Sequence, residues 1–377
     1  MPSPNRLNGV SLSRSSKQSI KERVSVWAPG AIALSLLTVV SLGLPMEPCA
    51  AQASPPTSPW ATQNASVLLV NPVGGNDDTA NGSDLAPFKT ITRALQVARS
   101  GTVIQLMPGT YSEETGERFP LQLKPGVAIQ GDPRNRGLEV VIKGSGFFLS
   151  PTSARQSVTV VAANQSSLAG VTIINPYAQG YGLWIESTSP TVTDNTFLMS
   201  GHDGISVVGN SAPLIRNNFF FQNGASGITI YGTSRPELRE NIFEQNGFAI
   251  NVNGNAMPLI IGNRITQNKD GVVVQSKARP ILRNNSIESN KRDGVVVIAQ
   301  AQPDLGKKGE PGGNFIRNNG QFDINATTSQ PVLAFGNELI KTAGLINASG
   351  EELAVIPVAG GGMVPQSSNL LRQAPYL

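Results

Sequence analysis

The sequence contains only one cysteine, Cys49, and one histidine, His202, in 377 residues. With a single cysteine, no disulfide can form within the chain. No cluster of metal-ligating residues, no phosphate-binding loop and no nucleophile triad is found in the sequence either. We therefore expect neither a metal nor a cofactor.

Charge is also scarce, since charged residues make up 14% of the chain and the formal net charge is +4. Five of the 29 basic and two of the 25 acidic residues precede Ser54, so the remainder holds 24 basic and 23 acidic residues. The sequence has no basic block with interleaved aromatic residues. The positive charge thus belongs mainly to the N-terminal segment, and we expect no nucleic-acid partner.

Long apolar runs are missing except for Ala31–Leu44, whose 14 residues fall short of the ~18 expected of a membrane span. A basic segment precedes this run, and Ala51-Gln52-Ala53 offers a small-x-small cleavage site. Residues 1–53 are therefore predicted to be a signal peptide, and residues 54–65 a linker rich in serine and proline. Cleavage would leave a secreted or periplasmic protein without a stable membrane span; an uncleaved N-terminal anchor is the alternative.

What the sequence does contain is a repeat between Gly182 and Val297. Prolines recur at intervals of 22 or 23 residues, an asparagine follows each after five residues, and a large apolar residue follows two positions later. The prolines are Pro190, Pro213, Pro236, Pro258 and Pro280; the asparagines are Asn195, Asn218, Asn241, Asn263 and Asn285; the apolar residues are Phe197, Phe220, Phe243, Ile265 and Ile287. Repetition at a fixed period indicates a repeat fold.

Within each repeat the apolar residues alternate, which is typical of a strand with one buried face. Two inward columns result, one of Leu183, Ile205, Ile228, Ile250, Val272 and Val295, the other of Ile185, Val207, Ile230, Val252, Val274 and Val297. Short strands joined by tight corners predict an all-β fold, a right-handed parallel β-helix formed by a single chain, with coils about 4.8 Å apart. A β-propeller blade needs about 40 residues, so the shorter period excludes it. The asparagine column is predicted to form a ladder of amides at one corner.

The N-terminal part adds a predicted strand, Ser66–Val70, a polar loop, and a helix predicted over Pro87–Ser100. Its pattern is Val70…Gly74…Asp77…Gly82…Pro87-Phe88-Lys89-Thr90-Ile91…Gly101-Thr102-Val103-Ile104…Pro108-Gly109-Thr110-Tyr111. This pattern resembles the start of secreted proteins of the pectin-lyase-like, right-handed β-helix superfamily, and in particular a bacterial domain of that superfamily whose function is unassigned. The resemblance spans about residues 66–337 and implies the fold, but says little about chemistry because one fold hosts many activities.

We predict that the β-helix occupies residues 66–337, with the N-terminal cap and first coil in 66–111 and the most regular coils in 182–297. The helix is expected to cover the first coil, whose apolar interior and unpaired edge would otherwise be open. Residues 132–167 are predicted to hold longer loops. Residues 338–377 are predicted to be a closing segment that ends in a loose tail.

Two groups of residues are catalytic candidates. His202 and Asp203 lie in a segment, Gly201–Val207, that resembles a short motif of the polygalacturonase type of β-helix glycosidase. Asp-Gly recurs at the same corner as Asp270-Gly271 and Asp293-Gly294, which favours a solvated corner instead. Arg216 and Arg239 are expected on adjacent coils, where arginine forks could hold an acidic sugar; a mixed surface charge is the alternative.

The candidate substrate-binding residues are Trp184, Glu186, Tyr231 and Asn251. Trp184 and Tyr231 alternate with inward residues, so both are predicted to face solvent, with Glu186 in the column of Tyr231 one coil earlier. Aromatic faces beside carboxylates and amides suit a sugar chain, although single exposed apolar residues are also normal. The sequence therefore favours an extracytoplasmic protein that binds polysaccharide or a cell-envelope glycan. A non-catalytic scaffold and a polysaccharide lyase or glycoside hydrolase are the alternatives.

Overall fold

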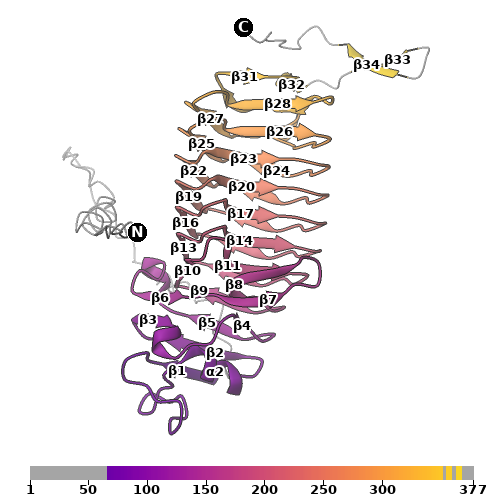
Figure 1. Cartoon of the computed structure of the whole chain (residues 1–377). Coiled ribbons are helices and arrows are strands. Elements are labelled where there is room, and N and C mark those ends of the chain that lie inside the picture. The colour runs from indigo at the N-terminus through magenta and orange to yellow at the C-terminus, as the bar shows by residue number, and fades with distance from the viewer. Residues whose placement is uncertain (1–65, 351–353, 359–361, 367–377) are drawn as a thin grey trace, which may run out of the picture. The chain divides into compact units, whose positions relative to one another are not determined.

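The computed structural model describes residues 66–350, 354–358 and 362–366. The predicted signal peptide (1–53) and linker (54–65) lie outside the described residues. Between residues 66 and 347 the chain winds into stacked coils, and most coils contribute one short strand to each of three parallel sheets (Figure 1). This arrangement is the predicted right-handed parallel β-helix.

Sheet I includes the strands that follow the repeated prolines. In stacking order they are β1 (Ser66–Val70), β2 (Thr102–Leu106), β5 (Ala128–Gln130), β9 (Ser167–Ala169), β12 (Thr191–Thr193), β15 (Leu214–Arg216), β18 (Glu237–Arg239), β21 (Leu259–Ile261) and β24 (Ile281–Arg283). Strand β1 has the bounds predicted from the sequence.

Sheet II includes the strands that follow the repeated asparagines. They are β3 (Gly109–Ser112), β6 (Val140–Lys143), β10 (Thr172–Ile174), β13 (Thr196–Leu198), β16 (Phe219–Phe221), β19 (Ile242–Glu244), β22 (Arg264–Thr266), β25 (Ser286–Glu288), β27 (Phe315–Arg317) and β30 (Glu338–Leu339). Its inward positions include the aromatic stack, in which Phe197, Phe220 and Phe243 lie with ring centroids 5.0 and 4.6 Å apart.

Sheet III contains the longest strands of the stack. They are β4 (Leu121–Gln122), β8 (Arg155–Val161), β11 (Gly180–Glu186), β14 (Asp203–Val208), β17 (Ser226–Ile230), β20 (Phe248–Val252), β23 (Asp270–Val274), β26 (Val295–Ala299), β28 (Ile324–Thr328) and β31 (Thr342–Ala343). One further strand, β7 (Gly146–Leu149), pairs antiparallel with β8 and forms a hairpin with it.

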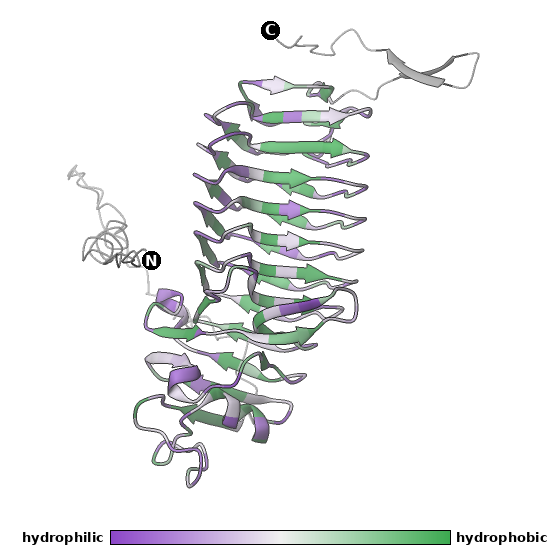
Figure 2. Ribbon diagram, viewed as in Figure 1, coloured by the Kyte–Doolittle hydropathy of each residue, from purple (hydrophilic) through white to green (hydrophobic). Residues whose placement is uncertain are grey.

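The core is the interior of the coils, where the inward columns predicted from alternation are fully buried. Hydrophobic residues lie mainly on the strands and hydrophilic residues at the corners between them (Figure 2). Strand pairing holds like positions in register, as with Leu183 opposite Ile205 and Ile228 opposite Ile250. Each fully buried Phe, Leu, Ile or Val side chain stabilises the fold by roughly 1.5–3 kcal/mol.

The predicted asparagine ladder is present at the corner between sheets I and II. Each side-chain Nδ2 donates to Oδ1 of the next asparagine, from Asn195 to Asn337. The residue before each rung adopts positive φ, for example Asn217 and Glu240. The side-chain amides thus form hydrogen bonds with backbone groups that the tight turn would otherwise leave unpaired.

A second ladder, which we did not predict, occupies the corner between sheets II and III. Its rungs are Asn223, Asn246, Asn268, Asn290 and Asn319, joined by the same Nδ2-to-Oδ1 hydrogen bonds. These asparagines recur at the same 22- or 23-residue period as the first ladder up to Asn290. The signal was therefore present in the sequence.

The N-terminal helix is shorter than predicted. Helix α2 spans Ile91–Val97 instead of Pro87–Ser100, because Thr90 caps it and the chain is extended at Ala98. Its buried residues, Ile91, Ala94 and Leu95, join the core of the first coils. Two short 3-10 helices, η1 (Glu113–Thr115) and η2 (Pro133–Asn135), interrupt the following loops.

The C-terminal part departs from the prediction in one respect. Strands β30, β31 and β32 (Ile346–Asn347) continue parallel pairing beyond the predicted end at residue 337, and β32 pairs with β29 (Val332–Leu333). A local antiparallel hairpin of β33 (Ala354–Val358) and β34 (Gly362–Gln366) follows. The repeat is too weak here to be read from the sequence, because the proline and asparagine markers have ended.

Candidate functional site

The outer face of sheet III carries three columns of outward side chains. Residues Trp184, Ser206, Thr229 and Asn251 stand in one column on successive coils, as the sequence predicts. A neighbouring column holds Glu186, Val208 and Tyr231 and continues with Asn253 and Gln275. A third contains Tyr181, Asp203, Ser226, Phe248 and Asp270 on the side of the corner with sheet II.

The prediction that Trp184 faces solvent is wrong. Trp184 points away from the coil interior, but only 3% of its surface is exposed. It lies in a separate apolar cluster with Val158 and Val208, against which Phe148 of the β7–β8 hairpin packs. The hairpin therefore covers the indole, which is unavailable for stacking on a sugar.

Glu186 also has a different setting from the one predicted. Two coils, not one, separate it from Tyr231, because Val208 stands between them in the column. Its carboxylate accepts hydrogen bonds from the Trp184 Nε1 at 2.9 Å and from the hydroxyls of Ser150 and Thr152. Partial burial alone raises the pKa of Glu186, but these hydrogen bonds outweigh it and the pKa lies below its ordinary value. Glu186 thus anchors the tip of the hairpin.

Tyr231 and Asn251 are accessible in the way the sequence predicts. Tyr231 is 53% exposed just after β17, and Asn251 is half-buried on β20. Oδ1 of Asn251 accepts a hydrogen bond of 2.8 Å from Gln275 Nε2 on the next coil. An aromatic ring and a row of amides therefore lie on adjoining columns, with coils about 4.8 Å apart.

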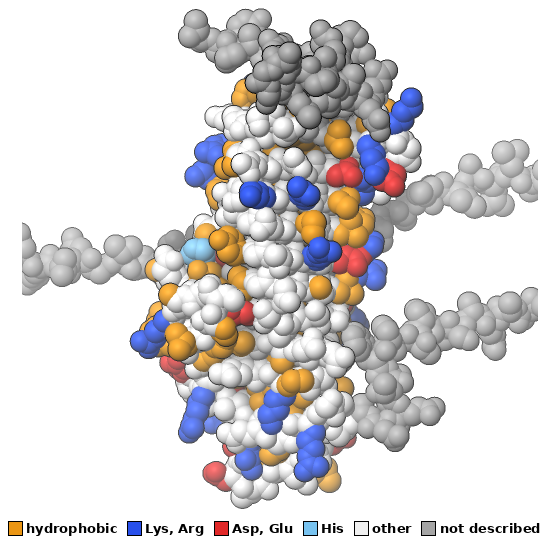
Figure 3. Space-filling view, turned by 90° about the vertical axis from the view of Figure 1, so that its right-hand side faces the viewer, with side chains coloured by type: hydrophobic (Ala, Val, Ile, Leu, Met, Phe, Trp, Pro, Cys, Tyr) orange, Lys and Arg blue, Asp and Glu red, His pale blue; other side chains and the backbone are white. Residues whose placement is uncertain are grey.

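A shallow hollow of about 400 Å³ adjoins this face at the corner between sheets III and I. Gly254, Asn255, Ser276, Lys277, Ala299 and Gln300 line it. Figure 3 views the side on which the strands of sheet III end, and charged and apolar side chains are scattered over it. Sequence reasoning missed this hollow, because its residues occupy corner positions that carry no apolar period.

His202 and Asp203 are close together, but Asp203 is not solvated as predicted. His202 Nδ1 lies 3.0 Å from Asp203 Oδ1, without the alignment of a full hydrogen bond. Asp203 is buried, and its other oxygen accepts a hydrogen bond of 2.8 Å from Ser206. The Asp203 carboxyl raises the pKa of His202, against the opposing effect of partial burial.

The same corner contains further buried acids where a solvated corner was expected. Asp270 is fully buried and accepts two hydrogen bonds from Arg292, and Asp293 accepts hydrogen bonds from the Phe322 amide and from Asn325. These carboxylates join neighbouring coils. Tyr181 packs on the His202 ring with centroids 4.8 Å apart, and burial together with the nearby Asp203 raises the pKa of Tyr181.

Arg216 and Arg239 are neighbours in register on β15 and β18, as predicted. Both guanidinium groups are already paired, Arg216 with Glu240 at 2.9 Å and Arg239 with Glu237. A carboxylated ligand would have to displace these pairs. The arrangement is the mixed surface charge that the sequence analysis left as the alternative.

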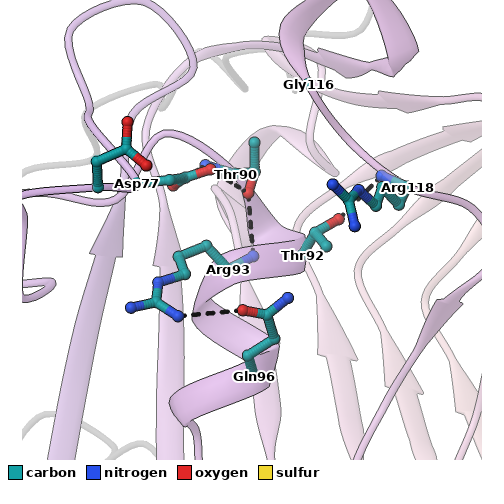
Figure 4. A pocket seen from close by; sticks show the side chains of 8 residues that line it. Asp77, Thr90, Thr92, Arg93, Gln96, Gly116 and Arg118 are labelled. Carbon is teal, nitrogen blue, oxygen red and sulfur yellow. Dashed lines mark hydrogen bonds between the residues drawn. The ribbon is translucent and has the colours of Figure 1, made fainter.

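A second hollow, of about 370 Å³, lies beside helix α2 and contains Asp77, Thr92, Arg93 and Arg118 (Figure 4). Asp77 accepts hydrogen bonds from the amides of Lys89 and Thr90 and from the Thr90 hydroxyl. Buried Glu117 accepts from the amides of Ile91 and Thr92 at the start of the helix. Burial raises the pKa of Glu117 despite these bonds. The polar groups here mainly hold the helix in place.

Within residues 66–350, no group of three or more His, Cys, Asp or Glu side chains is arranged to hold a metal ion. No helix among the described residues is long and apolar enough to cross a membrane.

The three stacked parallel sheets, the inward columns and the asparagine ladders define the class: this is a right-handed parallel β-helix protein. Within that class, the chain belongs to the family described as Protein of unknown function (DUF1565), which matches residues 73–343. No curated protein is a significant match.

Solved structures with a similar fold include XylC in complex with xylose, with a TM-score of 0.50 at 11% identity over 74% of this chain and 70% of that one. The pectate lyase Pel9A gives 0.49 at 14% identity over 82% and 90%. The polygalacturonase from Erwinia carotovora ssp. carotovora gives 0.46 at 11% identity over 75% and 96%. At these identities the likeness concerns the fold alone.

Proposed function

We propose that this protein binds a polysaccharide outside the cytoplasm, on the outer face of sheet III around Tyr231. The observation that carries the proposal is the exposed Tyr231 ring beside amide side chains on successive coils, next to the corner hollow. Aromatic rings with a polar tip supply apolar contact area and a hydrogen-bonding group together. Such a combination suits a sugar, which has apolar ring faces and hydroxyl edges.

The repeating geometry of the face also supports a polymer as the ligand. Thr229 and Asn251 follow one another in one column, and Tyr231, Asn253 and Gln275 in the next. These three coils thus offer hydroxyl and amide groups at about 4.8 Å intervals, and Val273 follows Asn251 in the first column. A chain of sugar units lying along the stack would meet hydroxyl or amide groups on each of these three coils, whereas a small molecule would use only one or two.

We propose binding and not catalysis because the candidate catalytic residues are buried or already paired. Asp203 is buried under His202 and Ser206, and the two arginines are engaged with glutamates. The extracytoplasmic location rests on the apolar run and cleavage site within residues 1–53.

The experiment is a comparison of two tyrosine variants across a panel of polysaccharides. Tyr231 and Tyr177 are exposed to similar extents, 53% and 55%, but Tyr177 lies in the loop before β11, away from the amide columns. We expect Tyr231→Ala to weaken binding about tenfold, the loss of one aromatic contact of about 1.4 kcal/mol. Tyr177→Ala should bind like the unaltered protein.

Isothermal titration with the exported protein measures the affinities, and product analysis in the same samples measures any cleavage. Equal binding by both variants and the unaltered protein would place the ligand elsewhere. If the protein releases shortened polysaccharide chains and His202→Ala abolishes that release, the function is enzymatic and its site is the Gly201–Gly204 corner.

A further inference from the structure

Three cations gather at the corner between sheets III and I, next to the proposed binding face. Lys277 lines the hollow there, and Arg235 and Arg279 are exposed at equivalent corner positions. Backbone hydrogen bonds fix their register, from Met257 N to Ser234 O and from Arg279 N to Ala256 O, each 2.9 Å. Arg235 and Arg279 are therefore two coils apart, about 10 Å, with Lys277 beside Arg279.

These cations differ from the other arginines of the neighbouring surface in having no acidic partner among the described residues. Arg216, Arg239 and Arg283 of sheet I each pair with a glutamate or aspartate. In the upper half of Figure 3, some basic side chains near the middle of the face stand apart from acidic ones, whereas others lie beside them toward the right margin. The corner thus has an uncompensated positive charge.

The backbone between the binding face and these cations carries little side-chain bulk. The turn after each sheet III strand adopts positive φ at Gly232, Gly254, Ser276 and Ala299. A Cβ at Gly254 would lie 3.0 Å from the Gly232 carbonyl oxygen, so the stacked turns leave little room for larger residues. A ligand that lies on Tyr231 and Asn253 can therefore extend around the corner to Lys277 without meeting a large side chain.

We propose that the polysaccharide is anionic and that Lys277, with Arg279 and Arg235, binds its acidic groups at this corner. This inference rests on the proposed function. An ammonium and two guanidinium groups donate charge-assisted hydrogen bonds to carboxylate or sulfate oxygens, and each such bond is stronger than one to a neutral hydroxyl. Because the cations are exposed, the attraction is screened by salt.

The test uses pairs of polymers that differ only in charge. One pair is a polyuronate and the same polymer with its carboxylates reduced to alcohols; the other is dextran sulfate and dextran. We expect both anionic polymers, or the one whose acid fits the corner, to bind at least tenfold more tightly than their neutral partners. Raising the salt concentration should reduce that preference.

The matched variants are Lys277→Gln with Arg279→Gln, and Lys269→Gln with Lys291→Gln. Lys269 and Lys291 are exposed cations at the opposite corner of sheet III. The first pair should lose about tenfold in affinity for the anionic polymer, as expected for two exposed charge-assisted contacts, and keep its affinity for the neutral one. The second pair should match the unaltered protein.

Two results would overturn the inference: equal affinity for the charged and neutral polymers, or equal losses in the two double variants. If the charged and neutral polymers bind equally but Tyr231→Ala still weakens binding, the proposed function stands and only the inference about charge fails. If instead Tyr231→Ala has no effect on any polymer, the proposed function itself fails.

Discussion

The only histidine of the chain is held against a buried carboxylate, so its ionisation is linked to folding. Asp203 raises the pKa of His202 in the folded state above the unfolded value of about 6.5. Protonated His202 is therefore favoured by folding. The stabilisation is complete below the unfolded pKa and is lost as the pH rises through the folded pKa. Because 32% of the His202 side chain is exposed, the effect should stay within about 1 kcal/mol.

A comparison with His202→Gln measures this contribution. The unaltered protein should lose unfolding free energy as the pH rises above about 6.5, the ordinary pKa of histidine, because the pKa of His202 is higher in the folded state. His202→Gln should show a flatter profile over the same range. Urea denaturation at closely spaced pH values gives both curves, and parallel curves would show that the Asp203 contact does not contribute.

For single residues, the sequence predicts the side of a strand on which a side chain lies better than it predicts what surrounds that side chain. Alternation fixes which side of a strand Leu183 and Trp184 occupy, because the period of two is a local property of the backbone. Whether an outward residue meets solvent depends on what else covers the strand. Trp184 and Asp203 are both buried by residues distant in sequence or on neighbouring coils. Such burial cannot be predicted from a local sequence pattern.

Among the elements, the β7–β8 hairpin is the one that alters the predicted site. It replaces a regular coil segment with an antiparallel pair, and its Phe148 packs against the cluster of Val158, Trp184 and Val208. Residues 132–167 were predicted only to hold longer loops, because their strands lack the proline and asparagine markers. The regular coils could be predicted in register, whereas this insertion could not.

We expect Trp184→Ala to loosen the hairpin and to leave the Tyr231 face intact. The substitution removes a buried aromatic side chain and the hydrogen bond to Glu186, and should cost about 3–5 kcal/mol in unfolding free energy. Limited proteolysis within residues 150–154 should become faster than in Tyr177→Ala, which removes an exposed ring. Unchanged proteolysis and stability would show that the indole does not hold the hairpin.

At the scale of the whole molecule, the two asparagine ladders join each coil to the next from Asn195 to Asn337 and from Asn223 to Asn319. Asn241 accepts hydrogen bonds from the backbone and side chain of Asn218 and donates to Ile215 and Asn263. Its substitution leaves buried polar groups on two coils without partners. The first ladder could be predicted because its asparagines keep a fixed distance from the prolines.

Asn241→Leu should therefore lower the unfolding free energy by about 1–3 kcal/mol. Asn246→Leu should have an effect of the same size in the second ladder, where the bonding is equivalent. Exposed Asn210, outside both ladders, provides the control with Asn210→Leu. Chemical denaturation compares the three, and ladder variants as stable as the control would contradict a structural role for the amides.

Because the coils stack in register, the number of coils could be changed without disrupting the rest of the fold. Each coil meets only its neighbours, and the inward columns and the ladders repeat like residues from coil to coil. Removal of residues 241–262 would therefore bring Asn263 to Asn218 and Ile265 to Phe220. The remaining ladders would close again, and the outer face would be shorter by one coil. For a polymeric ligand, the number of coils that carry hydroxyl or amide groups on this face thus sets the valency, since each such coil offers another set of contacts at a high effective concentration.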